Sequence, residues 1–175
     1  AIRNWKNLDH NRFLCDFGTV SRQIHIQNEI EASGAGLKYI SCYAEENYER
    51  FAEEMRSILQ QGGYDVVHLH TRFWKSFLVE EIARDCGIPK VIVHAHNTEV
   101  NLEEQEARSM AEKVHWQKRK EFNTSLATDF WACSTLAADW LFGEQIPRDR
   151  IVIMNNAVEV EKFLFSQAIR EKYRR

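Results

Sequence analysis

Two short apolar segments of the chain end in the same polar pattern. Residues 64–70 (YDVVHLH) and residues 90–97 (KVIVHAHN) begin with β-branched apolar side chains, and each then carries two histidines separated by one residue. Continuous apolar segments of this length are typical of strands buried on both faces. Residues 73–87 lie between them and are about one helix long. The pattern therefore predicts a strand–helix–strand unit whose strands both end in histidines.

The rest of the chain repeats this alternation of apolar segments and helical spacing. The expected strands are 12–20, 37–42, 129–134 and 151–154, and the expected helices are 27–32, 47–61, 102–128, 135–142 and 161–175, with 1–8 as the tail of a further helix. Ser134 is placed to cap the helix that begins at Thr135. Short connections between alternating strands and helices predict an α/β fold with a parallel sheet and right-handed crossovers.

Composition narrows the class of protein. The chain has 175 residues, 44% apolar and 28% charged, and a net charge of −3, which fits one globular domain and argues against a general nucleic-acid binder. No apolar run approaches the roughly 20 residues of a membrane span, and no signal-peptide pattern occurs at Ala1. The four cysteines are scattered without a C-x-x-C spacing. We therefore expect a cytoplasmic protein with reduced thiols.

The four histidines at the strand ends carry the candidate chemistry. In open parallel sheets, ligands bind outside the carboxyl ends of the strands. As metal ligands, the pairs His68/His70 and His94/His96 would have good chelating geometry. Metal-dependent hydrolases that use such pairs are usually barrels of about 250 residues, however, and no carboxylate follows these strands. The sequence therefore predicts no metal site, although a small metal-dependent hydrolase stays open as an alternative.

A second interpretation gives one histidine the role of general base, because imidazole titrates near neutral pH. His70 and His96 lie at the tips of the expected strands, and His96 is followed by Asn97 and a loop. His68 and His94 lie deeper, where hydrogen-bonded structural roles are expected. No Walker loop, G-x-G-x-x-G or G-x-S-x-G motif occurs in the chain.

Residues 115–120 (HWQKRK) form a basic and aromatic stretch on the expected long helix. Such a stretch is either a solvated helix face or a contact for an anionic substrate or for lipid headgroups. Contact with lipid headgroups would place the protein peripherally on the inner face of the membrane.

Several segments together resemble a known family. Residues 64–97 resemble the N-terminal half of GT-B retaining glycosyltransferases of family 4, most of all the bacterial capsular and exopolysaccharide branch. Residues 127–143 (ATDFWACS…AADWLFG) and residues 151–159 (IVIMNNAVE) with Phe163 are similar to later segments of that branch, and residues 3–17 resemble the segment that opens its second strand. The chain departs from the pattern at Ala157, where the family has glycine, and at Glu159, where it has aspartate.

The resemblance implies a Rossmann-like parallel sheet with helices on both faces, one half of a GT-B fold. Residues 1–160 would be the N-terminal, acceptor-side domain without its first strand and glycine-rich loop, which would precede Ala1. Residues 161–175 would be a terminal helix leading toward a C-terminal donor-binding domain. Such an enzyme transfers a sugar from a nucleotide sugar to a glycan or lipid-linked acceptor in cell-surface polysaccharide synthesis. We expect no cofactor beyond the nucleotide-sugar substrate, and an inactive fragment.

The resemblance also ranks the site residues. His96 matches a histidine that lies beside the reacting sugar in some relatives, and it is the expected catalytic residue. The expected substrate-binding residues are loop positions on the same edge of the sheet: His70, Thr71, Asn97, Ser134 and Asn156. A stand-alone binding module is the alternative that involves no catalysis.

Overall fold

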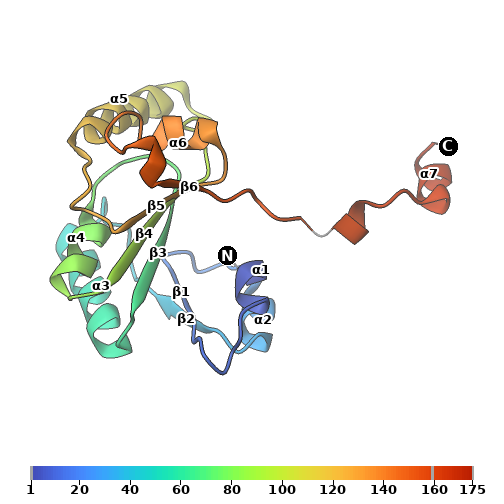
Figure 1. Ribbon diagram of the computed structural model, residues 1–175, viewed down its shortest axis with the longest axis horizontal. Coiled ribbons are helices and arrows are strands. Elements are labelled where there is room, and N and C mark those ends of the chain that lie inside the picture. Colours follow the sequence, from blue (N-terminus) through green and yellow to red (C-terminus); the bar gives the residue numbers. More distant parts are fainter. Residues whose placement is uncertain (1, 159, 175) are drawn as a thin grey trace.

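The computed structural model describes residues 2–158 and 160–174, and within them six strands form two parallel sheets (Figure 1). The elements in chain order are α1 (Ile2–Lys6), β1 (Asp16–Thr19), α2 (Gln27–Ala32), β2 (Gly36–Tyr39), α3 (Tyr48–Gly62), β3 (Val66–Thr71), α4 (Leu78–Asp85), β4 (Lys90–Ala95), α5 (Gln105–Glu121), β5 (Asp129–Ala132), α6 (Thr135–Leu141), the 3₁₀ turn η1 (Arg148–Arg150), β6 (Ile151–Ile153), the 3₁₀ turn η2 (Val160–Phe163) and α7 (Gln167–Tyr173). One sheet pairs β1 with β2, and the other has the order β3-β4-β5-β6. The expected α/β class is confirmed.

Local sequence signals set the ends of α3. The side chain of Asn47 accepts a hydrogen bond from the backbone N–H of Arg50 and so caps the first turn. Gly63 ends the helix in the left-handed conformation, with φ of 59°, which glycine adopts without steric cost. Phe51 and Leu59 are the buried residues of this helix.

Helices lie on both sides of the strands. On one side α3, α4 and α6 cover the four-stranded sheet, and the core between them contains Val91, Val93 and Phe130. On the other side α1 and α2 pack on the two-stranded sheet through Trp5 and Ile30. The two apolar clusters are separate. The expected Rossmann-like arrangement is therefore confirmed.

The expected parallel sheet is divided into two sheets. In residues 2–158 and 160–174, β1 pairs only with β2 and β3 pairs only with β4, so both keep a free edge. The phenol of Tyr64 donates a hydrogen bond of 2.5 Å to Asp16 and joins the two sheets by side chains.

Two expected helices were too long. The helix expected over residues 102–128 is α5, which ends at Glu121 because Phe122 is extended and the Asn123 side chain accepts from the backbone N–H of Ser125.

The expected terminal helix over 161–175 is interrupted, because Ser166 caps a new helix, α7. Its preceding side chains, Phe163 to Phe165, are exposed, and Figure 1 shows this arm extending away from the sheets. Glu159 lies outside the described residues.

Among the described residues, no helix combines the length and apolar character needed to cross a bilayer.

Candidate functional site

The parallel strands bring four loops to one edge of the larger sheet. Thr71 at the end of β3 pairs with Ala95 of β4, Ala95 pairs with Ala132 of β5, and Ala132 pairs with Ile153 of β6. The residues that follow these strand ends therefore gather at the same edge, as the sequence predicted.

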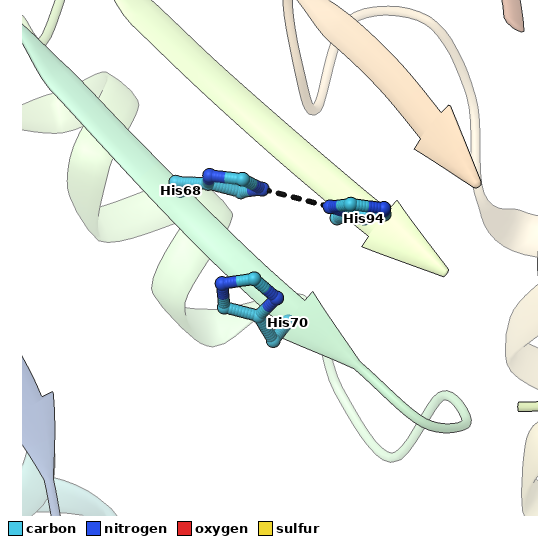
Figure 2. A group of neighbouring side chains, drawn as sticks. All are labelled: His68, His70 and His94. Atoms are coloured by element: carbon cyan, nitrogen blue, oxygen red, sulfur yellow. Dashed lines mark hydrogen bonds between the residues drawn. The ribbon is translucent and has the colours of Figure 1, made fainter. Parts of the chain in front are cut away.

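Four histidines form a cluster on one face of β3 and β4. Alternate residues of a strand share a face, so His68 lies beside His70, and His94 lies beside His96. The register pairs His70 with His94 across the two strands. His68 Nε2 lies 3.1 Å from His94 Nδ1, the contact drawn as a dashed line in Figure 2, and His70 Nδ1 lies 2.7 Å from His96 Nε2. The histidine cluster, His68, His70, His94 and His96, is thus linked in two cross-strand pairs.

Trp131 of β5 closes one side of the histidine cluster. It pairs in register with His94, and its ring meets the rings of His68 and His94 edge-on at centroid distances of 5.1 and 5.8 Å. The side chain is half-buried. The apolar residues around Trp131 predict a core position, but its place in the register turns it to the histidine face instead.

The histidine cluster is neutral at pH 7. Burial lowers the pKa of His68 and of His94 to about 4, and partial desolvation beside the other rings also lowers the pKa of His70 and of His96. His94 is the most buried, with 4% of its surface exposed, whereas His70 is exposed. The placement of His94 below the tips agrees with the sequence prediction. Each neutral imidazole offers one N–H donor and one lone pair.

Three of the predicted site residues lie next to one another. His96 contacts His70 on one side, and the side chain of Asn156, from the loop after β6, is close enough to His96 to act on its pKa. The Asn156 contact acts to raise the pKa of His96, although burial is the larger influence and lowers it. The strand ends therefore bring together residues separated by up to 86 positions in sequence, from His70 to Asn156.

The other three predicted residues lie at the same edge in different settings. Thr71 is half-buried at the end of β3, and Asn97 is half-buried directly after His96. Ser134 is the cap of α6, and its hydroxyl accepts a hydrogen bond of 3.1 Å from the backbone N–H of Ala137. The capping role that the sequence predicts for Ser134 is confirmed.

A pocket of about 410 Å³ opens beside His70 and Thr71. Its polar lining includes side chains from the loop after β3 and from two neighbouring elements: Glu45, Arg72, Lys75 and Glu80. Lys75 forms an ion pair of 2.7 Å with Glu45, and burial raises the pKa of the Glu80 carboxyl, 4% exposed, to about 7. The sequence analysis missed these residues.

The stretch 115–120 is not one surface patch. His115 is fully buried: its Nδ1 accepts from the backbone N–H of Trp74, and its Nε2 donates to the carbonyl of Trp140. Arg119 lies over the exposed ring of Trp116 at 4.5 Å and donates to the carbonyl of Asp139. Part of this predicted patch therefore holds α5 against α6.

The family model described as "Glycosyl transferase 4-like domain" matches residues 22–157. The chain belongs to this family. It is also 26% identical over 168 residues to a putative glycosyltransferase, EpsF, of Bacillus subtilis (strain 168), covering 91% of this chain and 41% of EpsF. The family membership that residues 64–97 and the later segments predict is thereby confirmed. These comparisons do not favour the small metal-dependent hydrolase.

Solved structures support the fold. A glycosyltransferase from Rickettsia africae ESF-5 superposes with a TM-score of 0.65 at 15% identity, over 98% of this chain and 44% of that one. MnaA of S. aureus, solved with UDP, gives a TM-score of 0.53 at 14% identity, over 92% of this chain and 49% of that one. The UDP-GlcNAc 2-epimerase of Neisseria meningitidis, solved with UDP-GlcNAc, gives 0.50 at 15% identity, over 91% and 51%. The chain spans about half or less of each of these proteins.

Proposed function

We propose that residues 1–160 are the acceptor-side domain of a glycosyltransferase that uses a nucleotide sugar. Family membership and the likeness to the putative glycosyltransferase EpsF support the transferase class. The structures solved with UDP and UDP-GlcNAc support a nucleotide-sugar donor. The acceptor in this proposal is a glycan or a lipid-linked glycan of the cell surface, transfer retains the anomeric configuration, and the enzyme works in the cytoplasm at the inner face of the membrane.

The observation that carries the proposal is the row His70–His96–Asn156 beside the pocket. His96 pairs with His70 and lies near Asn156, and its imidazole is neutral at pH 7. A neutral imidazole at a strand end can accept a proton or a hydrogen bond from a sugar hydroxyl. The adjacent pocket, with Thr71 and the Lys75–Glu45 ion pair on its wall, offers polar contacts to an acceptor. We assign contact with the reacting sugar to His96 and binding of the acceptor hydroxyls to this pocket.

The donor contacts in this proposal come from a second domain of a longer enzyme, toward which residues 161–175 lead. A further strand of that enzyme could pair with both β1 and β3, each of which is an edge strand in the described residues. Such a strand would join the two sheets, which the Tyr64–Asp16 hydrogen bond links by side chains. We therefore propose that the 175 residues alone are inactive.

The test is transfer by the full-length enzyme, produced from its natural reading frame and supplied with labelled UDP-sugars and a lipid-linked glycan fraction. We expect His96→Ala to lower kcat/KM by about 100-fold or more, the usual effect of removing a proton-transfer group. His25→Ala, an exposed histidine outside the cluster, should keep full activity. NMR of the product reports the anomeric configuration. Full activity of His96→Ala, or transfer by the 175-residue chain alone, would overturn the corresponding assignment.

A further inference from the structure

Three of the clustered histidines converge on one point in space. His68 and His70 come from β3 and His94 comes from β4, as Figure 2 shows. Each offers one ring nitrogen, and these three nitrogens all lie within 4.8 Å of one another. The convergence is fixed by the backbone, because the strand period places His68 beside His70 and the register places His94 opposite His70.

Two nitrogens of this group face each other across the strands. His68 Nε2 lies 3.1 Å from His94 Nδ1. His94 Nε2, on the far side of the same ring, points away from the group; it is buried and has no hydrogen-bond partner among the described residues. The exposed edge of His70 leaves a route from solvent to the three converging nitrogens. An ion that enters there would take the lone pairs of His68 Nε2 and His94 Nδ1 in place of the contact between them.

The chemistry of the donors selects the ligand. Three imidazoles without a carboxylate suit borderline transition-metal ions such as Zn²⁺, Co²⁺ or Ni²⁺, whereas Mg²⁺ and Ca²⁺ require oxygen ligands. Zinc–nitrogen bonds of 2.0–2.1 Å place tetrahedral ligands roughly 3.3 Å apart, so side-chain rotation would have to bring the nitrogens closer together. His70 is exposed, which leaves its ring room to turn. A fourth position would remain for water, as in three-histidine zinc sites.

We propose that His68, His70 and His94 bind one borderline transition-metal ion, represented by Zn²⁺. The sequence analysis predicted no metal because carboxylates are missing from the strand ends, but a three-histidine set does not need one. The proposal concerns binding alone, and it does not rest on the proposed transferase function.

Titration of the tag-free chain with Zn²⁺ after dialysis against EDTA tests the proposal. Calorimetry should show one ion per chain for the wild type and for His25→Ala, whose exposed histidine lies outside the cluster. His70→Ala and His94→Gln should each weaken binding by more than the roughly 10- to 100-fold that the loss of an outer-shell partner costs. His70 is exposed, so that His70→Ala leaves the core packing intact.

Substitution with Co²⁺ identifies the ligands. Visible absorption typical of a nitrogen-ligated tetrahedral site, lost in His70→Ala, would support the proposal. Thiolate-to-cobalt charge transfer would place the ion on a cysteine such as Cys133, whose sulfur lies 3.5 Å from the carbonyl of His96, and would overturn the proposal. Failure of the wild type to bind Zn²⁺, or equal affinity in the wild type and His70→Ala, would also overturn it.

Discussion

The Nδ1 atom of His70 lies 2.7 Å from the Nε2 atom of His96, so the tips of β3 and β4 share a hydrogen bond between two imidazoles. Burial lowers the pKa of both rings, and one ring therefore donates its N–H to the lone pair of the other. This contact fixes the orientation of His96, which is the residue that we assign to the reacting sugar.

His70→Ala in the full-length enzyme should lower kcat/KM by roughly 10- to 100-fold, because His96 loses the partner that holds its ring. Since His70 acts through His96, the double variant His70→Ala/His96→Ala should be no less active than His96→Ala alone. Assays in EDTA keep metal binding out of the comparison. Independent, multiplicative losses in the two variants would show that His70 contacts substrate by itself.

His115→Ala should destabilise the chain by about 3 kcal/mol, because it leaves a cavity and removes the partner of the Trp74 N–H and one of the two donors to the Trp140 carbonyl, which keeps Arg119. Urea unfolding measures this, with the exposed His25→Ala as control, expected within about 0.5 kcal/mol of wild type. Burial lowers the pKa of His115 to about 4, below its unfolded value of 6.5. Its contribution should therefore be complete above pH 6.5 and decline as pH falls toward 4.

Glu80→Gln should stabilise the chain at alkaline pH. Burial raises the pKa of Glu80 from 4.5 to about 7, so the folded state holds a proton that the unfolded state releases above pH 4.5. Stability from this group thus falls as pH rises from 4.5 through 7, by about 3 kcal/mol in total. The glutamine variant lacks this dependence, and its advantage over wild type should grow between pH 5 and pH 8 in thermal unfolding. Parallel pH profiles would contradict the assigned burial of Glu80.

Ile82→Ala and Ile169→Ala remove the same atoms from opposite environments. Ile82 is 0% exposed in the main core, and Ile169 is 59% exposed on α7. We expect Ile82→Ala to cost about 2–5 kcal/mol in denaturant unfolding, and Ile169→Ala to change stability by less than about 0.5 kcal/mol. A comparable loss in Ile169→Ala would mean that the terminal arm packs on the sheets in solution.

Ser134→Ala should cost about 1 kcal/mol, because the hydroxyl caps α6 through the Ala137 N–H. Ser134→Asp should retain the cap and most of the stability. Ser166→Ala, which removes the cap of the exposed α7, is the matched control and should leave the main unfolding transition unchanged. If Ser134→Asp abolishes transfer in the full-length enzyme without a loss of stability, the residue also contacts substrate.

The sequence by itself determined the class of the fold and most of its elements. The apolar segments 64–70 and 90–97 hold most of β3 and all of β4, 27–32 is a helix with the predicted bounds, and Ser134 caps α6. These features are local: strand composition, helical spacing and a capping side chain act within a few residues. The positions of the histidine pairs at the strand ends and the order of the family segments could be read from the sequence too, because they also depend on local signals.

Only the tertiary structure decided which of those residues meet. The two-sheet arrangement, the row His70–His96–Asn156 and the contact of Glu45 with Lys75 depend on strand register and on loops that close over long sequence separations. The sequence placed His115 on a basic surface, whereas packing of α5 against α6 buries it. The physical reason is common to these cases: periodicity sets which face of an element a side chain occupies, but the partner of that face is chosen by packing between elements.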